Sequence, residues 1–403
     1  MIEIKDKKDC CGCWACENAC PKQCISMLED EEGFRYPQVD KASCIDCHLC
    51  EKVCPILNVQ PEKEKAQHGY LLQIKNDSIR EESTSGGSFT AIASWIIQQG
   101  GVVYGAAFDY ADFKVKHCAA TTLPELSKFR NSKYVQSEIG HTYQEIKKLL
   151  QQDRWAVMSG TPCQIEGLVH YLRKPYEKLV LIDVVCYGIP SPGVFSDYLS
   201  YMHQKIGGQF TKVLFREKRL CYNYASFSLF NAIPSLDYHK GVESEPFMRS
   251  FFSDVNVRPS CYDCKFKKRY RVSDFTIWDC YDIKMFSDKF DDKGTNRVLV
   301  HSERGKNILN DIKDIVKMEE YKDLDYFIAD EIAMVKSVPM NAKREDFFKD
   351  YKSMDFDTFI NKWFPTTWKV RLNSFLRITA FRLGVYNESK RLVKRILGKN
   401  IHR

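Results

Sequence analysis

The chain has 403 residues, of which 44% are hydrophobic and 28% are charged. This length exceeds one ordinary core, so we expect two or three domains, and the mixed charges argue against general disorder. The net charge of +7 is uneven, because residues 362–403 contain eleven Lys or Arg and one Glu. The tail therefore carries about +10 and the remainder about −3, which argues against a nucleic-acid-binding protein.

Cysteine is abundant, with seventeen residues, ten of them before residue 55. The opening residues, MIEIKDKKDC, lack the apolar segment of a secretory signal, so we expect a cytoplasmic protein with reduced thiols. Clustered cysteines in that setting favour metal ligands over disulfides. The longest uncharged stretch, 88–108, is interrupted by Gln-Gln-Gly-Gly, which predicts a helix, a turn and a strand instead of a membrane span.

The cysteine block, residues 1–58, contains one motif twice: Cys10-x2-Cys13-x2-Cys16-x3-Cys20-Pro21, then Cys44-x2-Cys47-x2-Cys50-x3-Cys54-Pro55. This spacing is typical of bacterial two-cluster [4Fe–4S] ferredoxins, in which the fourth cysteine of one run ligates the other cluster. The block therefore predicts two clusters with crossed ligand sets: Cys10, Cys13, Cys16 and Cys54 for one, and Cys44, Cys47, Cys50 and Cys20 for the other.

Two structural zinc sites are the alternative, but zinc uses paired C-x2-C motifs and does not require the triple spacing followed by Cys-Pro. Cys11 and Cys24 lie outside the repeat. We interpret both as small buried side chains without a ligand role.

Beyond a polar linker at 59–68, residues 69–340 alternate β-rich runs with helical segments. We expect strands at 101–108, 155–159 and 179–185, and helices at 88–99, 165–173 and 191–205. Residues 341–403 lack strand patterns and predict a helical basic tail. The expected fold is α+β: a ferredoxin-like two-cluster domain, a mixed α/β domain and the tail.

Three loops of the mixed domain place chemically useful residues beside a helix or strand end. The turn Ser85-Gly86-Gly87-Ser88 precedes a helix and can expose backbone N–H groups to a phosphate, although such a turn is more often an N-cap. Cys163 and Cys186 each follow a buried strand, at the edge where ligands bind in α/β sheets. With the pair Cys261-x2-Cys264 they predict a third cluster, and four buried structural cysteines are the alternative.

These motifs, in this order, resemble the beta-subunit family of coenzyme F(420) (deazaflavin) hydrogenases and dehydrogenases. The resemblance covers residues 1 to about 300 and rests on the dicluster block, 84–89, 130–137, 160–165, 186–192, the Cys261–Cys264 pair and 273–279. It implies an FAD, a further [4Fe–4S] cluster beside it, and electron exchange with a deazaflavin or another two-electron carrier. It also places the Gly86-Gly87 turn and Ser132-Lys133-Tyr134 near the flavin, with Lys133 offsetting pyrophosphate charge.

The sequence departs from this family at Tyr187, where members usually have His, and at Trp278-Asp279, where they usually have Gly-Asp. These changes affect the flavin pose and the second substrate. Bacterial members are commonly associated with cell-surface polysaccharide synthesis, which the resemblance alone implies for this chain.

We therefore expect an iron–sulfur flavoprotein oxidoreductase, and the alternative is an electron-transfer subunit without a catalytic flavin. Its partner would be a redox protein or a small electron carrier. The basic tail carries Trp, Phe and Leu at helical spacings, which predicts peripheral contact with the inner face of a membrane. Packing of that apolar stripe on the body is the alternative.

Overall fold

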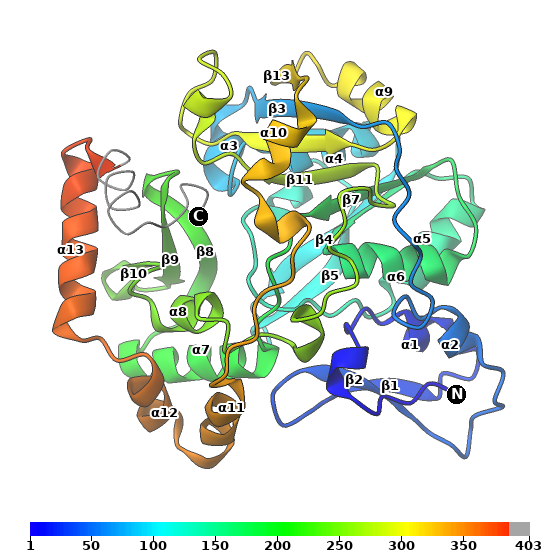
Figure 1. The fold of residues 1–403 in the computed structure, drawn as a ribbon, viewed down its shortest axis with the longest axis horizontal. Coiled ribbons are helices and arrows are strands. Elements are labelled where there is room, and N and C mark those ends of the chain that lie inside the picture. The colour runs from blue at the N-terminus through cyan, green and yellow to red at the C-terminus, as the bar shows by residue number, and fades with distance from the viewer. Residues whose placement is uncertain (387–403) are drawn as a thin grey trace.

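The computed structural model describes residues 1–386 (Figure 1). The cysteine block forms a small domain with two short helices and a hairpin whose strands pair from Ile25 with Val39 to Glu29 with Arg35. Its elements are α1 (Ala15–Ala19), β1 (Ile25–Glu29), β2 (Arg35–Val39) and α2 (Leu49–Lys52). Residues 59–67 then cross the surface, where Glu62 accepts from the Tyr270 amide and Gln67 donates to the Arg269 carbonyl.

An eight-stranded mixed sheet forms the centre of the body, in the order β13-β3-β12-β11-β7-β6-β4-β5. Only the pairs β4–β6, β6–β7 and β7–β11 are parallel. The strands are β3 (His68–Ile74), β4 (Val102–Asp109), β5 (Lys114–Ala120), β6 (Ala156–Gly160), β7 (Leu179–Val184), β11 (Phe275–Asp279), β12 (Asn296–Val300) and β13 (Val316–Tyr321).

Both faces of this sheet are buried, and alternate residues of each central strand serve different cores. In β7, Val180 and Ile182 face the core beneath α4 and α9, whereas Leu179 and Leu181 face the core shared with the cysteine domain. Continuous apolar runs are the usual sequence of such doubly covered strands. The helices around the sheet are α3 (Asp77–Glu82), α4 (Ser88–Gln98), α5 (Thr142–Gln151), α6 (Pro162–Leu172), α9 (Glu303–Asp311) and α10 (Leu324–Ala329).

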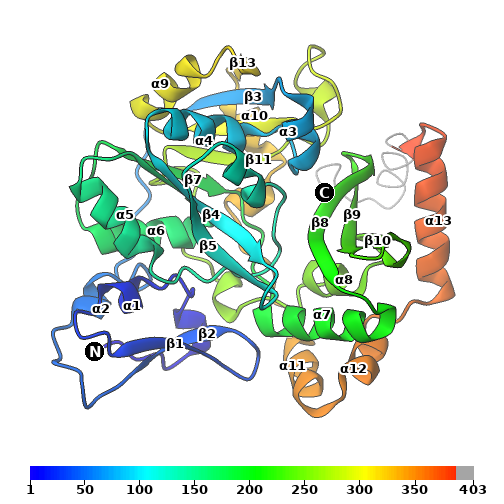
Figure 2. The same cartoon turned by 180° about the vertical axis from the view of Figure 1, so that it is seen from behind.

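A second lobe packs beside the sheet around an aromatic core (Figure 2). It contains a three-stranded antiparallel sheet in the order β10-β9-β8, together with α7 and α8. Its elements are α7 (Pro192–Ile206), β8 (Phe210–Cys221), β9 (Tyr224–Asn231), β10 (Tyr238–Gly241) and α8 (Pro246–Phe252). Helices α11 (Arg344–Ser353) and α12 (Phe356–Trp363) add Phe347, Phe348 and Phe359 to the same core.

The structure confirms all six helices and strands expected in the body, with bounds that differ by one to three residues. The largest shift is in α6, which begins at Pro162 instead of 165. Thr161 and Gln164 form a reciprocal capping box there, so the helix starts directly after β6. The mixed α/β fold with C-terminal helices is likewise confirmed.

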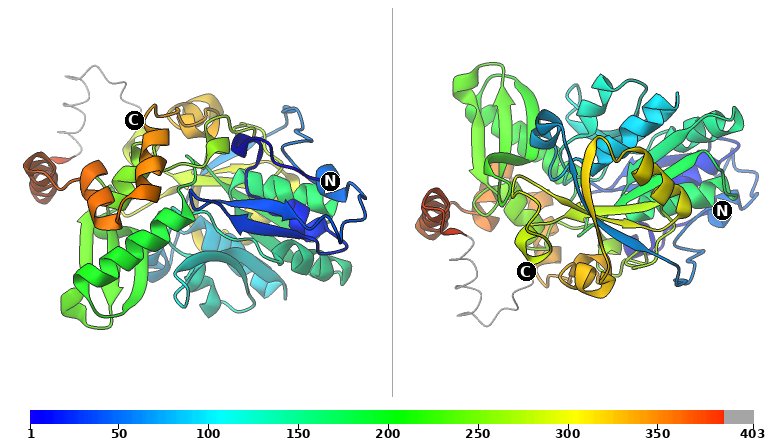
Figure 3. Two further views of the ribbon diagram at one scale, coloured as in Figure 1. Left: turned by 90° about the horizontal axis from the view of Figure 1, so that it is seen from below. Right: turned by 90° about the horizontal axis from the view of Figure 1, so that it is seen from above.

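The last described helix, α13 (Trp368–Arg382), lies at the edge of the molecule (Figures 1 and 3). Val370, Ile378 and Phe381 are half-buried on its inner side, and the Phe381 ring stacks on Tyr224. A second apolar strip, formed by Trp368, Leu372, Phe375, Leu376 and Leu383, is exposed. The tail's apolar residues thus divide between packing on the body and facing solvent. Residues 387–403, the rest of the predicted basic tail, lie outside the described residues.

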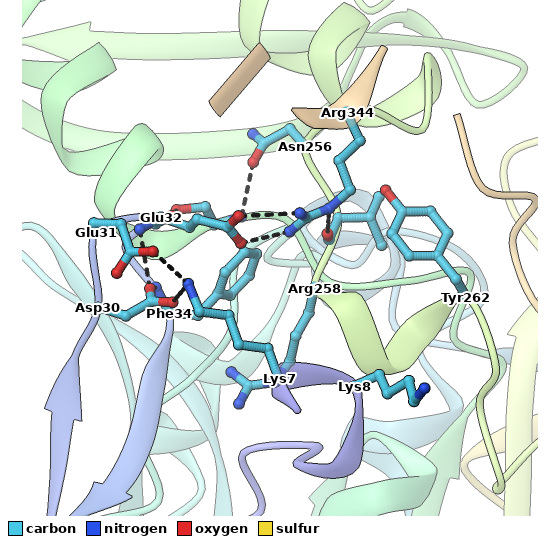
Figure 4. Close-up of polar contacts among 12 residues, drawn as sticks. Lys7, Lys8, Asp30, Glu31, Glu32, Phe34, Asn256, Arg258, Tyr262 and Arg344 are labelled. Atoms are coloured by element: carbon cyan, nitrogen blue, oxygen red, sulfur yellow. Dashed lines mark hydrogen bonds and ion pairs between the residues drawn. The ribbon is translucent and has the colours of Figure 1, made fainter. Parts of the chain in front are cut away.

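The cysteine domain is joined to α11 by a buried ion pair (Figure 4). Arg344 donates two hydrogen bonds to the Glu32 carboxylate, at 3.1 and 2.6 Å, and one to the Val257 carbonyl. Glu32 and Arg344 are 9% and 8% exposed, so removing the cation would leave an unpaired buried carboxylate.

We therefore predict that Arg344→Met lowers the free energy of unfolding by about 3 kcal/mol, the cost typical of breaking a buried pair. Urea denaturation followed by tryptophan fluorescence measures the change. Lys352→Met is the matched control, because Lys352 pairs with Glu31 on the same hairpin at an exposed site and should cost less than about 1 kcal/mol. Equal effects of the two substitutions would contradict the prediction.

Candidate functional site

The two cysteine runs fold into equivalent loops. In the first loop Gly12 and Trp14 have φ angles of +66° and +65°, and in the second Asp46 and His48, at the same places in the motif, have +49° and +56°. These left-handed residues curve each loop so that backbone N–H groups face sulfur. The Asp46 amide donates to Cys44 Sγ at 3.4 Å, and the equivalent Gly12 amide interacts with Cys10.

One cavity of the cysteine domain is lined by Cys10, Cys13, Cys16 and Cys54, with Cys11 as a fifth thiol. We call this the inner site, because α6 packs against its loop. The Gly167 position is so close that an added Cβ would lie 2.9 Å from Cys13 Cβ. Burial is the main cause that raises the pKa of Cys16 well above its usual value, followed by the neighbouring thiols.

A second cavity, the outer site, is lined by Cys44, Cys47, Cys50 and Cys20, with Cys24 as its fifth thiol. Cys24 Sγ lies 3.3 Å from Cys20 Sγ, and that contact raises the pKa of Cys24 to about 11. The structure thus brings together both crossed sets expected from the spacing. Cys11 and Cys24 are buried, as expected, but each lines one of the two cysteine-lined cavities, and sequence reasoning missed this position.

The arrangement also bears on the zinc alternative. Within residues 1–386, no three His, Cys, Asp or Glu side chains converge on a single ion position. The thiols instead line two separate cavities, each with four motif cysteines and a fifth thiol. Thiols arranged in this way suit a four-iron cluster better than one tetrahedral ion.

The third set of cysteines meets behind the inner site. Cys163 lies in the first turn of α6, just after β6, and Cys186 follows β7. Cys261 ends the short 3-10 helix Pro259–Cys261, and Cys264 follows it. Burial is the main cause that raises the pKa of Cys261, and the next contributions come from Cys186, Cys264 and Cys163. The four thiols therefore lie near enough to influence one another's pKa.

Cys11 connects this third set to the inner site. Hydrogen bonds with Cys13 and Cys163 are the main causes that raise the Cys11 pKa. The same contact and a hydrogen bond with Thr161 Oγ1 at 3.1 Å lower the pKa of Cys163 to about 7, although burial opposes this shift. The inner site is thus linked to the third set through Cys11.

The residues expected near a flavin lie in two loops that touch. Thr84 Oγ1 accepts from the Ser132 amide at 2.6 Å and contacts its hydroxyl at 3.0 Å. Ser85 contacts Tyr222, Lys133 donates to the carbonyls of Lys128 and Arg130, and the Tyr134 ring packs among Phe215, Phe251 and Phe252.

The glycine turn itself is closely packed. A Cβ on Gly86 would lie 2.3 Å from the Leu72 carbonyl oxygen, and one on Gly87, whose φ is +80°, would lie 2.7 Å from Ile74. The Ser88 amide donates to Asn296 Oδ1, while the buried Ser88 hydroxyl has no partner. The glycines therefore allow close packing on β3 and β12, and the orphan hydroxyl is the one group here suited to a ligand.

The two departures from the family pattern have structural roles. The Tyr187 hydroxyl donates to Asp254, and its ring packs edge-on against Phe251. Trp278 is buried on β11 against Phe327, with the Arg297 guanidinium over its ring, and Asp279 pairs with Arg216. Trp278 thus points into a core instead of toward the third cysteine set.

Comparison with known proteins finds two matching family models and a similar solved structure. Residues 9–57 match the family model of the 4Fe-4S dicluster domain, and residues 153–323 match the model of the C-terminal region of the coenzyme F420 hydrogenase/dehydrogenase beta subunit. A chain of the F420-reducing [NiFe] hydrogenase complex from Methanosarcina barkeri is 12% identical, with a TM-score of 0.43, over 64% of this chain and 85% of that one. The curated proteins include no match.

The fold and the thiol-lined sites define the class as an iron–sulfur oxidoreductase subunit, with a dicluster domain that implies two [4Fe–4S] clusters. More particularly, the second matched region carries Cys163, Cys186, Cys261 and Cys264, and is similar to the C-terminal part of coenzyme F420 hydrogenase or dehydrogenase beta subunits. Among residues 1–386, no helix is long and apolar enough to cross a membrane.

We predict that Cys54→Ser removes the inner cluster although Cys54 belongs to the second run, because the fourth cysteine crosses over. Iron content should fall by about four per chain, and low-temperature EPR of the reduced protein should lose the spin coupling between the clusters. Cys118→Ser is the matched control, because Cys118 is half-buried on β5, away from both cavities. Retention of the coupled signal in Cys54→Ser would refute the crossed ligand set.

Proposed function

We propose that this chain is an iron–sulfur flavoprotein oxidoreductase that passes electrons between a two-electron carrier and single-electron acceptors. The observation that carries the proposal is the close packing of the inner-site loop on α6, the helix that carries Cys163, where a Cβ on Gly167 would lie 2.9 Å from Cys13 Cβ. The interaction of Cys11 with Cys13 and Cys163 supports it. It joins the dicluster domain to the third cysteine set, so electrons have a continuous route from the surface into the body. An electron-transfer subunit without flavin would have less use for this inward route.

The proposed ligands of a third [4Fe–4S] cluster are Cys163, Cys186, Cys261 and Cys264. All four are partly buried, and they lie in the first turn of α6, after β7, and at and after the short 3-10 helix Pro259–Cys261. Lys267 lies beside them, with its amine donating to the carbonyls of Cys186, Tyr187 and Ala333. A cation at this position would offset the charge of a thiolate-bound cluster.

The proposed flavin is FAD, which converts between two-electron and one-electron transfer when bound. Ser85, Gly86, Gly87, Ser88, Ser132, Lys133 and Tyr134 are the residues we propose near it. The contact between Thr84 and Ser132 supports this placement, because it brings both loops to one place. The matched beta-subunit model supports a deazaflavin or another two-electron carrier as the partner, and a polysaccharide setting stays a prediction from the family resemblance.

We further propose three functional units: 1–58 as the electron relay with the linker 59–68, 69–340 as the flavin and third-cluster domain, and 341–403 as the tail. The buried pair between Glu32 and Arg344 supports a fixed connection between the first and last units. Helices α11 and α12 pack in one core with α7, so the first part of the tail unit is attached to the body. This packing supports a tail whose later residues extend from the body.

Anaerobic purification with iron, sulfide and flavin counts tests this function. We expect about twelve irons and about one FAD per chain, with resolved flavin bands above the iron–sulfur absorbance. Cys261→Ser should lower iron to about eight. The control is Cys221→Ser, a half-buried cysteine at the end of β8. About eight irons in the wild-type protein, unchanged in Cys261→Ser, would refute the third cluster, and absence of flavin would favour the electron-transfer subunit.

For the tail, we propose contact with an anionic membrane surface through α13. The helix carries Lys369, Arg371, Arg377 and Arg382 and no acidic residue, and its exposed strip includes Trp368, Phe375 and Leu383 at 64–70% exposure. Basic residues flanking exposed Trp and Phe are typical of interfacial helices. Each cation near an anionic surface contributes roughly 1 kcal/mol.

Flotation with liposomes that contain anionic lipid should therefore carry the full chain upward and leave a chain ending at residue 367 in the soluble fraction. This truncation keeps Phe364, which is buried in the core of the second lobe. Phe375→Ser should weaken flotation while preserving every charge, and neutral liposomes are the control. Equal soluble recovery of the full and shortened chains would contradict membrane contact.

A further inference from the structure

Arg258 is a fully buried cation at the junction of the inner site and the third cysteine set. It is 1% exposed. Its guanidinium donates to the carbonyls of Cys10 and Arg35 at 2.8 and 2.9 Å, to Gln136 Oε1 at 2.9 Å, and to Cys10 Sγ at 3.6 Å. None of these four groups is a carboxylate. Figure 4 shows Arg344 turned to Glu32, while Arg258 extends away from that pair.

Aromatic rings form the rest of its surroundings. The guanidinium lies 4.3 Å from the centre of the Tyr36 ring and 5.5 Å from that of Phe34. A buried cation costs several kcal/mol unless an anion or several hydrogen bonds stabilise it. The thiol of Cys10 is the one group in contact with Arg258 that becomes an anion when it binds iron. The natural counter-ion of Arg258 is therefore the thiolate-bound cluster of the inner site.

The same residue is tied to the third set. The Cys261 amide donates to the Arg258 carbonyl at 2.9 Å, and the Arg258 amide donates to the Ile189 carbonyl in the loop after Cys186. Hydrogen bonds with Cys11 and Thr161 are the main causes that lower the pKa of Cys163, and the Arg258 charge also contributes. Its charge thus lies between two thiol-lined sites, where the low dielectric screens it little.

The outer site has no comparable buried cation in its lining. Two amines line it: Lys22, which is exposed, and the Met1 N-terminus, which is partly exposed and lies 3.1 Å from Asp46 and 3.0 Å from Glu51. Solvent therefore screens the Lys22 charge, and two carboxylates and solvent offset that of the N-terminus. The loop amides at Gly12 and Asp46 are equivalent in the two sites, so Arg258 is the main electrostatic difference between them.

We propose that Arg258 is a positioning residue that raises the reduction potential of the inner cluster above that of the outer cluster. Reduction adds one electron and one negative charge to a cluster, with no proton required. A nearby buried cation and an N–H···S hydrogen bond stabilise that added charge, and both are known determinants of cluster potential. Electrons that enter at the outer site would then collect beside the third set. The inference rests on the proposed ligand sets.

The test is a redox titration of the anaerobically purified full chain, followed by EPR. Arg258→Gln removes the charge and should weaken reduction of the inner cluster at least tenfold, which is about 59 mV for a one-electron couple. Repeating the titration in a Cys47→Ser background, which removes an outer-site ligand, assigns the inner midpoint. In the Arg258→Gln variant with an intact outer site, the equilibrium constant for reduction of the outer cluster should change by less than twofold.

Arg258→Lys keeps the charge but cannot reproduce the planar set of donors, so we expect a smaller weakening of about threefold. If Arg258→Gln does not retain iron, the inner midpoint measured in Arg258→Lys tests the inference in its place. Arg344→Met is the matched control, a buried arginine whose partner is Glu32, and it should leave the inner midpoint within twofold.

Two results would overturn the inference. One is a midpoint potential of the inner cluster that lies below that of the outer cluster in the wild-type protein. The other is an equilibrium constant for reduction of the inner cluster that changes less than twofold in every iron-containing Arg258 variant. Both results leave the proposed function intact. A failure of the ligand sets appears separately, as an unchanged coupled EPR signal in Cys54→Ser.

Discussion

The close contact between the Cys10–Cys16 loop and α6 is the constraint on which the rest of the arrangement depends. Gly167 allows the helix backbone to approach Cys13, and Gln136 donates to the carbonyls of Cys11 and Gly12 from the opposite side. Any side chain at Gly167 would force the loop away from the body. Because electron transfer requires short separations between centres, this contact determines whether the dicluster domain exchanges electrons with the body or functions as an independent ferredoxin.

The central sheet makes that contact possible because its two faces pack against different parts of the protein. One face buries β6 and β7 residues beneath α4 and α9, and the other carries α5 and α6 with the cysteine domain docked on them. The parallel order of β4, β6 and β7 brings the loops after β6 and β7 to one edge. Cys163 and Cys186 therefore meet without any special turn, and the segment after Arg258 closes the set with Cys261 and Cys264.

The buried arginines Arg344 and Arg258 differ in the partners that surround their charge. Arg344 has a carboxylate partner and fixes the N-terminal hairpin to α11, so its role is structural. Arg258 donates its hydrogen bonds to carbonyls, an amide and a thiol and lies against two aromatic rings, which fits a role toward a bound cluster. A buried arginine thus has two different roles in this protein, and the role depends on whether the protein itself provides the anion.

The sequence by itself determined the ligand spacing of the cysteine block and the type of six elements in the body, because these depend on local motifs and apolar periodicity. It also predicted that Cys163 and Cys186, from their places after strands, belong with the otherwise incomplete pair Cys261-x2-Cys264. Only the tertiary structure decided the positions of Cys11 and Arg258, since Arg258 meets Cys10 across 248 residues. The packing role of Gly86 and Gly87 was likewise decided there, because β3 and β12 approach the turn from distant parts of the chain and no local pattern records that approach.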